Sequence, residues 1–162
     1  MDSTLKRTWA EIDLDALSHN YHMLREKIGS EVKFLGVVKA DAYGHGAPAV
    51  AAVLREEGIS DFAVATIEEG IALRNSGIEG QILIFGYTDP ENIRKLRKYR
   101  LTQTLISKEY ARRLNQKKVR IDVQIKIDTG MHRLGLDAER LEDIRTLFAL
   151  KYLHETGMYT HL

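Results

Sequence analysis

The stretch VKFLGVVKA, residues 32–40, is a short apolar run that carries Lys39 near its end. Such a run is typical of a strand that is buried on both faces, as in a parallel sheet covered by helices. The glycine-containing segment DAYGHG, residues 41–46, follows it, and a helix is predicted from Ala47 onward. Strand, loop and helix in this order predict one βα unit of an α/β protein.

Apolar runs and amphipathic stretches alternate along the rest of the chain. Further strands are predicted at residues 62–65, 81–85, 101–106, 121–127 and 157–160. A more alternating strand, predicted at residues 8–13, would belong to a separate sheet. Helices are predicted after Asp13, after Asp89, which precedes a proline, and over residues 141–148. Strands separated by helices of this length predict parallel pairing.

The number of units leaves two topologies open. About five βα units and a sixth strand follow the N-terminal segment. A closed (β/α)8 barrel needs eight strands, whereas an open doubly wound sheet needs fewer. Because Leu162 comes directly after an apolar strand with no covering helix, we expect the chain to be part of a longer protein.

The bulk properties predict a globular protein. The 162 residues are 44% hydrophobic and 29% charged, with a formal net charge of +1 and no cysteine. A hydrophobic core is therefore possible, whereas strong attraction to nucleic acid or anionic lipid, disulfides and thiolate metal sites are not expected. The N-terminus does not resemble a signal peptide, and no run approaches the roughly 18 apolar residues of a spanning helix. We expect a cytoplasmic protein.

Two other polar patterns have simple interpretations. The basic run over residues 94–100 falls near a predicted helix C-terminus, where cations offset the helix dipole, so a solvated helix end is favoured over a nucleic-acid site. His19 and His22 lie three residues apart on a predicted helix without a cysteine or acidic partner, so no metal site is predicted.

Reactive side chains follow the predicted strands where each strand ends. They are Lys39, Tyr87, Asp128, Arg133 and His161. In parallel α/β folds, functional sites are built at the carboxyl ends of the strands. We therefore expect these groups to face one side of the sheet.

Lys39 is the strongest candidate for chemistry. Burying a lysine as an ammonium ion is costly, and burial favours the neutral amine, a nucleophile that can form a Schiff base. Free amides in residues 41–46 suit a phosphate, to which Tyr43 could add a hydroxyl. The alternative is a lysine that has simply reached solvent at the end of its strand.

Four segments of the chain resemble alanine racemases. The sequence VKADAYGHG, residues 38–46, is similar to the family's signature around its cofactor lysine over nine consecutive positions. Residues 126–135, KIDTGMHRLG, and residues 157–161, GMYTH, match two later landmarks, and WAEIDL, residues 9–14, resembles the opening strand. The resemblance extends in family order from Trp9 to Leu162.

The resemblance implies a fold-type III enzyme that depends on pyridoxal 5'-phosphate. Its fold would be a (β/α)8 TIM-type barrel with a C-terminal β-domain, of which residues 1–162 would be the N-terminal, cofactor-binding portion. The implied activity is racemisation of L-alanine to D-alanine for cell-wall precursors. The implied working form is a homodimer.

The resemblance also implies roles for single residues. Lys39 would hold the cofactor through a Schiff base and move the α-proton on one face, while Tyr43 would contact the phosphate. Arg133 would hold the cofactor's phenolic oxygen and the substrate carboxylate. Lys126 matches a lysine that is often carbamylated, and His161 would lie against the pyridine ring. Taken singly, Arg133 could be a surface ion-pair partner, Lys126 an outward residue of its strand, and His161 a structural histidine.

Two departures from the family pattern bear on function. His132 stands where a glycine is more usual, which resembles the serine/alanine racemases of vancomycin resistance and leaves serine as an alternative substrate. The family's second base, a tyrosine contributed across the dimer, would lie beyond position 162. We therefore predict no substantial racemase activity for the isolated chain.

Two other classes compete with a racemase. Gly44 and Gly46, with Glu68 and Glu69 roughly twenty residues later, have the spacing of a variant dinucleotide-binding fingerprint, but the first glycine comes too late after the strand. A non-catalytic pyridoxal-phosphate-binding barrel would also carry a strand-end lysine, although it would lack the long lysine motif and the arginine loop.

Overall fold

One curved sheet organises the chain, and the computed structural model describes residues 8–162 of it. Strands β1 to β5 pair in sequence order, β7 pairs with β5, and the short β6 pairs with the far end of β5. All of these pairings are parallel. The strands are β1 (Leu35–Val37), β2 (Asp61–Val64), β3 (Ile82–Ile84), β4 (Thr102–Leu105), β5 (Ile121–Asp128), β6 (Leu136–Asp137) and β7 (Leu153–Tyr159).

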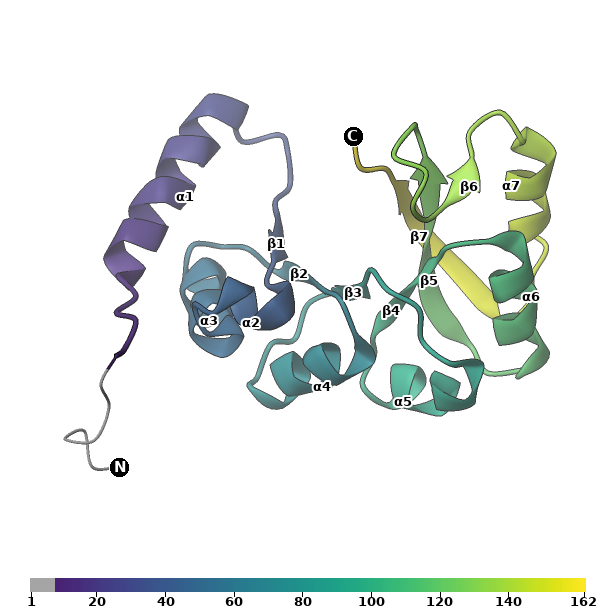
Figure 1. Ribbon diagram of the computed structural model, residues 1–162, viewed down its shortest axis with the longest axis horizontal. Coiled ribbons are helices and arrows are strands. Elements are labelled where there is room, and N and C mark those ends of the chain that lie inside the picture. The colour runs from purple at the N-terminus through teal and green to yellow at the C-terminus, as the bar shows by residue number, and fades with distance from the viewer. Residues whose placement is uncertain (1–7) are drawn as a thin grey trace.

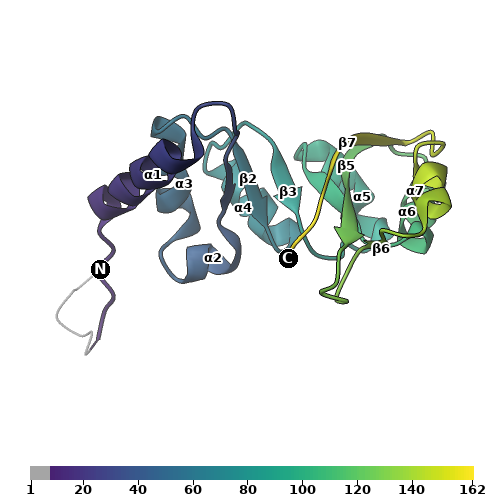
Figure 2. The same cartoon turned by 90° about the horizontal axis from the view of Figure 1, so that it is seen from above.

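Helices line the outer, convex side of this sheet (Figure 1). The helical segments are α1 (Leu14–Ile28), α2 (Lys39–Tyr43), α3 (Ala47–Glu56), α4 (Ile67–Asn75), the 3-10 turn η2 (Pro90–Asn92), α5 (Ile93–Lys98), α6 (Lys108–Gln116) and α7 (Leu141–Leu147). A doubly wound sheet has helices on both faces, whereas here they cover one. The arrangement is therefore that of an incomplete (β/α) barrel, as Figure 2 shows from above.

Asp13 and Asp89 begin two of the predicted helical segments with side-chain caps, whereas the predicted helix over residues 141–148 begins without one. Asp13 accepts a hydrogen bond from Ala16 N at 2.9 Å and opens α1, and Asp89 accepts one from Glu91 N at 2.9 Å ahead of α5. Thr66 and Glu69 form a reciprocal capping box at the start of α4. These caps satisfy backbone N–H groups that a first helical turn leaves free.

Two expectations about strands are wrong. Residues 8–13 form no strand, because no segment among residues 8–162 lies beside them to complete a ladder. The first barrel strand is shorter than residues 32–40 and is not buried on both faces. Leu35 and Val37 are 38% and 46% exposed because they face the open, concave side of the sheet, whereas the intervening Gly36 is buried against Phe62.

Among residues 8–162, no helix has both the length and the apolar character needed to cross a membrane. The same residues contain no group of three or more histidine, cysteine, aspartate or glutamate side chains arranged to hold a metal ion.

Replacing Tyr110 with phenylalanine tests how the loop after β3 is held. The buried Tyr110 hydroxyl donates to Thr88 O at 2.7 Å and accepts from Thr88 N at 3.2 Å. We expect Y110F to lower the free energy of unfolding by about 1–3 kcal/mol, because both backbone groups lose their partner in a buried site. Urea denaturation measures this effect. The control is Y99F, since the Tyr99 hydroxyl makes no hydrogen bond within residues 8–162, and an equal loss in both variants would contradict the prediction.

The same tyrosine makes stability depend on alkaline pH. Burial raises the pKa of Tyr110 above its ordinary value of 10.0. At alkaline pH the folded state therefore keeps a proton that the unfolded state releases. The contribution of Tyr110 to the free energy of unfolding is complete below pH 10 and is lost as the pH rises above 10. Y110F should show a smaller loss of stability between pH 9 and about pH 11 than the parent protein.

Candidate active site

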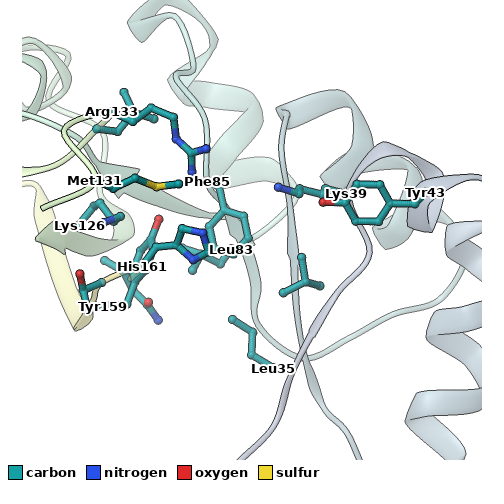
Figure 3. Close-up of a pocket in the computed structure, with 14 residues that line it drawn as sticks. Leu35, Lys39, Tyr43, Leu83, Phe85, Lys126, Met131, Arg133, Tyr159 and His161 are labelled. Atoms are coloured by element: carbon teal, nitrogen blue, oxygen red, sulfur yellow. The ribbon is translucent and has the colours of Figure 1, made fainter. Parts of the chain in front are cut away.

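A cavity of about 450 Å³ opens on the concave side of the sheet, at the carboxyl ends of β1, β3, β5 and β7. Its size lies within the usual range for small-molecule sites. Lys39 and Tyr43 approach it from one wall, and Arg133, Lys126 and His161 approach it from the opposite wall (Figure 3). The structure thus brings together all five side chains to which the sequence analysis assigned roles.

The electrostatic character of the cavity is positive. Two lysines, an arginine and a histidine line it, and no aspartate or glutamate does. Leu83 and Phe85 of the β3 region supply an apolar floor between the cations. Such a lining suits a ligand with a flat apolar body and anionic groups at its edges.

Lys39 occupies the junction between β1 and an unusual turn. Ala40 to Tyr43 all have φ between 51° and 54°, so α2 is a left-handed turn of four non-glycine residues. The Lys39 Nζ lies 5.8 Å from the centre of the Tyr43 ring, which the turn carries back to the cavity wall. Asp41 braces the far end of the turn, since its Oδ1 accepts from Ala47 N at 2.7 Å.

Lys126 faces into the cavity and is almost completely buried. Its side chain lies on the same face of β5 as Gln124, and the residue is 7% exposed. Its Nζ donates to Ile127 O at 2.7 Å and lies 5.8 Å from the centre of the Tyr159 ring. The interpretation of Lys126 as an outward strand residue is therefore wrong.

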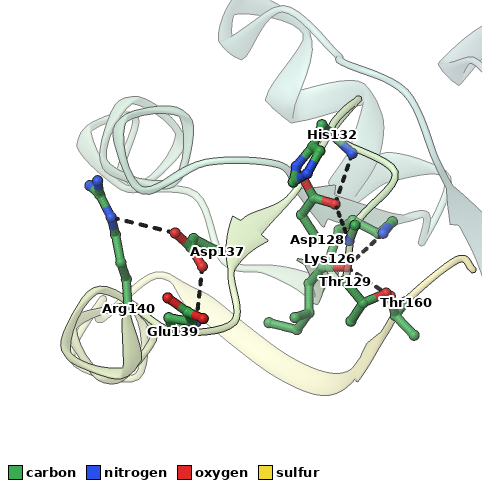
Figure 4. Close-up of polar contacts among 10 residues, drawn as sticks. Lys126, Asp128, Thr129, His132, Asp137, Glu139, Arg140 and Thr160 are labelled. Atoms are coloured by element: carbon green, nitrogen blue, oxygen red, sulfur yellow. Dashed lines mark hydrogen bonds and ion pairs between the residues drawn. The ribbon is translucent and has the colours of Figure 1, made fainter.

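The loop that carries Arg133 is fastened to the end of β5 by Asp128 (Figure 4). Asp128 Oδ1 accepts from Gly130 N at 3.1 Å and from His132 N at 3.0 Å, and its Oδ2 lies 3.2 Å from the His132 ring. Hydrogen bonds from the backbone of His132 and Gly130 hold the pKa of Asp128 below its ordinary value. Asp128 therefore acts on the loop and does not line the cavity itself.

His132 is turned away from the cavity. Its side chain is 84% exposed, bonds to Asp128 and is not part of the lining. Its backbone has φ 53°, a conformation that costs glycine little, which accounts for the glycine more usual at this position. Because the His132 side chain does not line the cavity formed by residues 8–162, any influence of His132 on substrate choice must act through the loop that carries Arg133.

Two aromatic residues that line the cavity were not predicted from the sequence. Tyr159 and Phe85 line the cavity with their ring centres 5.6 Å apart, and the Tyr159 hydroxyl lies 3.0 Å from Thr104 Oγ1. Burial raises the pKa of Tyr159. Tyr159 stood inside the quoted segment 157–161, so its place at a strand end was an available signal. Tyr87, which was expected at this edge, lies outside the lining and stacks on Tyr110 at 4.9 Å.

A half-open parallel barrel with a cationic cavity at its strand ends defines the class of this protein. It is an α/β barrel protein with a cationic cavity at the carboxyl ends of its strands. The model of the family "Alanine racemase, N-terminal domain" matches residues 12–162, and the chain belongs to this family.

Relatives and solved structures agree with this assignment. The chain is 48% identical to a serine/alanine racemase of Enterococcus gallinarum over 98% of its own length and 22% of the relative's. It is 43% identical to an alanine racemase of Carboxydothermus hydrogenoformans over 97% of its own length and 44% of the relative's. An alanine racemase of Clostridium difficile 630 in complex with cycloserine superposes with a TM-score of 0.89 at 40% identity, covering 98% of this chain and 45% of that one. The chain thus spans less than half the length of these proteins.

Proposed function

We propose that this chain is the cofactor-binding portion of a pyridoxal 5'-phosphate-dependent racemase that converts L-alanine to D-alanine for cell-wall precursors in the cytoplasm. The convergence of Lys39, Tyr43, Lys126, Arg133 and His161 on one cavity supports this proposal. Membership of the alanine racemase family supports it independently.

The residues of the cavity fit the cofactor and its substrate. Pyridoxal phosphate brings a phosphate and a phenolic oxygen, and an amino acid brings a carboxylate, which together match a lining of cations without acids. The apolar side chains of Leu83 and Phe85 offer a surface for an aromatic ring. When bound, the cofactor withdraws electrons from the α-carbon, so that its proton can be removed.

Each side chain has a task that its chemistry allows. Lys39 would hold the cofactor covalently and would accept or return the α-proton at Nζ on one face of the substrate. Tyr43 donates a hydrogen bond to the phosphate, and the planar fork of Arg133 binds the carboxylate and the phenolic oxygen. His161 would lie against the pyridine ring.

We propose carbamylation for Lys126. An ammonium group at this buried position has only the Ile127 carbonyl as a hydrogen-bond acceptor among residues 8–162, which leaves its charge poorly compensated. A carbamate, formed when the neutral Lys126 amine adds to carbon dioxide and releases a proton, would replace this cation with an anion on the wall that carries Arg133 and would orient the guanidinium.

Racemisation also needs an acid on the opposite face, which we assign to a tyrosine of a partner subunit in a homodimer. We expect the isolated 162-residue chain with added cofactor to produce no D-alanine, because it supplies one base of two. The full-length protein should exchange the α-proton of alanine with solvent deuterium and form D-alanine. Racemisation by the isolated chain would contradict the two-base proposal.

The same assay separates the competing functions. A non-catalytic pyridoxal-phosphate-binding protein would take up the cofactor without exchanging the α-proton. Serine is the second candidate substrate, because a relative at 48% identity is named a serine/alanine racemase. The ratio of kcat/KM for L-serine and L-alanine in the full-length protein decides between the two substrates.

A further inference from the structure

The residues directly after Lys39 form a left-handed turn that is unfavourable for non-glycine residues. Ala40, Asp41, Ala42 and Tyr43 have φ of 51°, 54°, 51° and 54°, and none of them is glycine. Each of these conformations is disfavoured for an L-residue by contact of Cβ with the following carbonyl oxygen. A run of four persists only where the surroundings hold it in place.

Glu69 of α4 provides such a hold. Its Oε1 accepts a hydrogen bond from the backbone N–H of Ala40 at 2.8 Å, across 29 positions of sequence. Its Oε2 accepts from Ala65 N at 2.7 Å and from Thr66 N at 3.3 Å. One carboxylate therefore ties the residue directly after Lys39 to the end of the neighbouring strand β2.

The division between the two oxygens separates two functions. The oxygen that bonds Ala65 and Thr66 completes the capping box of α4, a local task within four residues. The oxygen that bonds Ala40 has no part in that cap. It fixes the first residue of the strained turn, at the point where the chain leaves β1 and the Lys39 side chain departs toward the cavity.

We infer that Glu69 is the positioning residue for Lys39. It holds the left-handed turn in place through the Ala40 amide, and so keeps the lysine amine aimed into the cavity. The inference rests on the proposed function of Lys39.

The variant E69Q tests this role with little change in shape. A glutamine side chain has one acceptor oxygen, so it can serve either Ala65 and Thr66 or Ala40, and its NH2 group then faces the remaining N–H. Because two donors lie on the Oε2 side, we expect the amide oxygen to stay there. The loss should therefore fall on the Ala40 bond.

The main measurement follows Lys39 without turnover. Full-length apoprotein is mixed with pyridoxal 5'-phosphate, the adduct is reduced with borohydride, and peptide mapping gives the rate at which Lys39 is modified. We expect E69Q to slow this rate about tenfold, as for the loss of one charge-assisted hydrogen bond. In the loaded enzyme, kcat for alanine should fall by a similar factor, with KM changed less than about twofold because Glu69 is not part of the cavity lining.

Glu68 and Ala40 provide the matched variants. Glu68 precedes Glu69 in the first turn of α4, is exposed, and makes no side-chain hydrogen bond within residues 8–162, so E68Q removes the same charge without the tie. E68Q should retain the parent rate of Lys39 modification.

Adding A40G to E69Q should restore part of the rate of Lys39 modification. Glycine adopts a positive φ without penalty, so the turn then depends less on Glu69.

The outcomes separate this inference from the proposed function. If the parent protein forms no adduct at Lys39, the proposed function fails, and the inference fails with it. If the parent forms the adduct and E69Q forms it equally fast, only the role of Glu69 is overturned. Amide hydrogen exchange of the parent protein gives a test that needs no variant: the Ala40 amide should be protected like that of Ala65, and free exchange at Ala40 would overturn the inference.

Discussion

K39A is expected to eliminate racemisation by the full-length protein, with kcat/KM for L-alanine lowered by about 10³-fold or more. The substitution removes the amine that the β1 wall of the cavity presents, and with it both the proposed covalent link to the cofactor and one proton carrier. Formation of D-alanine measures the activity. Borohydride reduction and peptide mapping should find no pyridoxyl group at position 39.

K33A is the matched control for this variant. Lys33 lies just before β1, is exposed, and does not line the cavity, so its removal should leave kcat/KM unchanged. Since Lys39 is only partly buried, K39A should unfold at the same urea concentration as K33A. A tenth or more of the parent activity in a folded K39A variant would show that Lys39 is not the catalytic amine.

The parts of the fold that were predicted from sequence depend on local signals. Asp13 and Asp89 cap helices with their own side chains, and the runs that became β2 to β5 are short, apolar and bounded by polar residues. Lys39, Arg133 and His161 could be placed together because parallel strands all present their carboxyl ends at one edge. The cavity contains these three side chains, whereas Tyr87 and Asp128, which the same argument placed with them, do not line it.

Other features depend on partners that lie far away in sequence. The left-handed turn after Lys39 could not be predicted, because ADAY contains no glycine and one of the hydrogen bonds that hold the turn comes from Glu69, 29 positions away in sequence. A strand over residues 8–13 requires a neighbour that residues 8–162 do not supply. Alternation of apolar and polar residues shows that a segment can form a strand, but the hydrogen-bonded ladder also needs a neighbouring strand.

The missed aromatic residues illustrate a different ambiguity. Phe85 and Tyr159 are aromatic residues, and most aromatic side chains are buried because they pack in a hydrophobic core. What distinguishes them is the open concave face of the sheet, onto which both rings project. Apolar residues occupy both faces of β3, so the sequence does not show which face borders the cavity.

R133K should lower kcat/KM for L-alanine about 10- to 100-fold, mainly through a higher KM, although it keeps the charge. Arg133 is carried by a loop that Asp128 fastens through two backbone amides, so the guanidinium is presented at a fixed place on the cavity wall. A lysine there offers a flexible point charge in place of a planar fork. It cannot donate two parallel hydrogen bonds to a carboxylate. Steady-state kinetics with alanine measures the effect.

R140K distinguishes recognition of the carboxylate from a general effect of charge. Arg140 is also exposed, but it lies beyond the loop, pairs with Asp137 at 3.7 Å, and does not line the cavity. R140K should therefore leave both kcat and KM unchanged. If R133K also behaved like the parent, a point charge would suffice at the anchor, and the carboxylate would have to be oriented by another donor. If instead R133K lost kcat with KM unchanged, Arg133 would act on the cofactor's phenolic oxygen in the transition state and not on binding of the carboxylate.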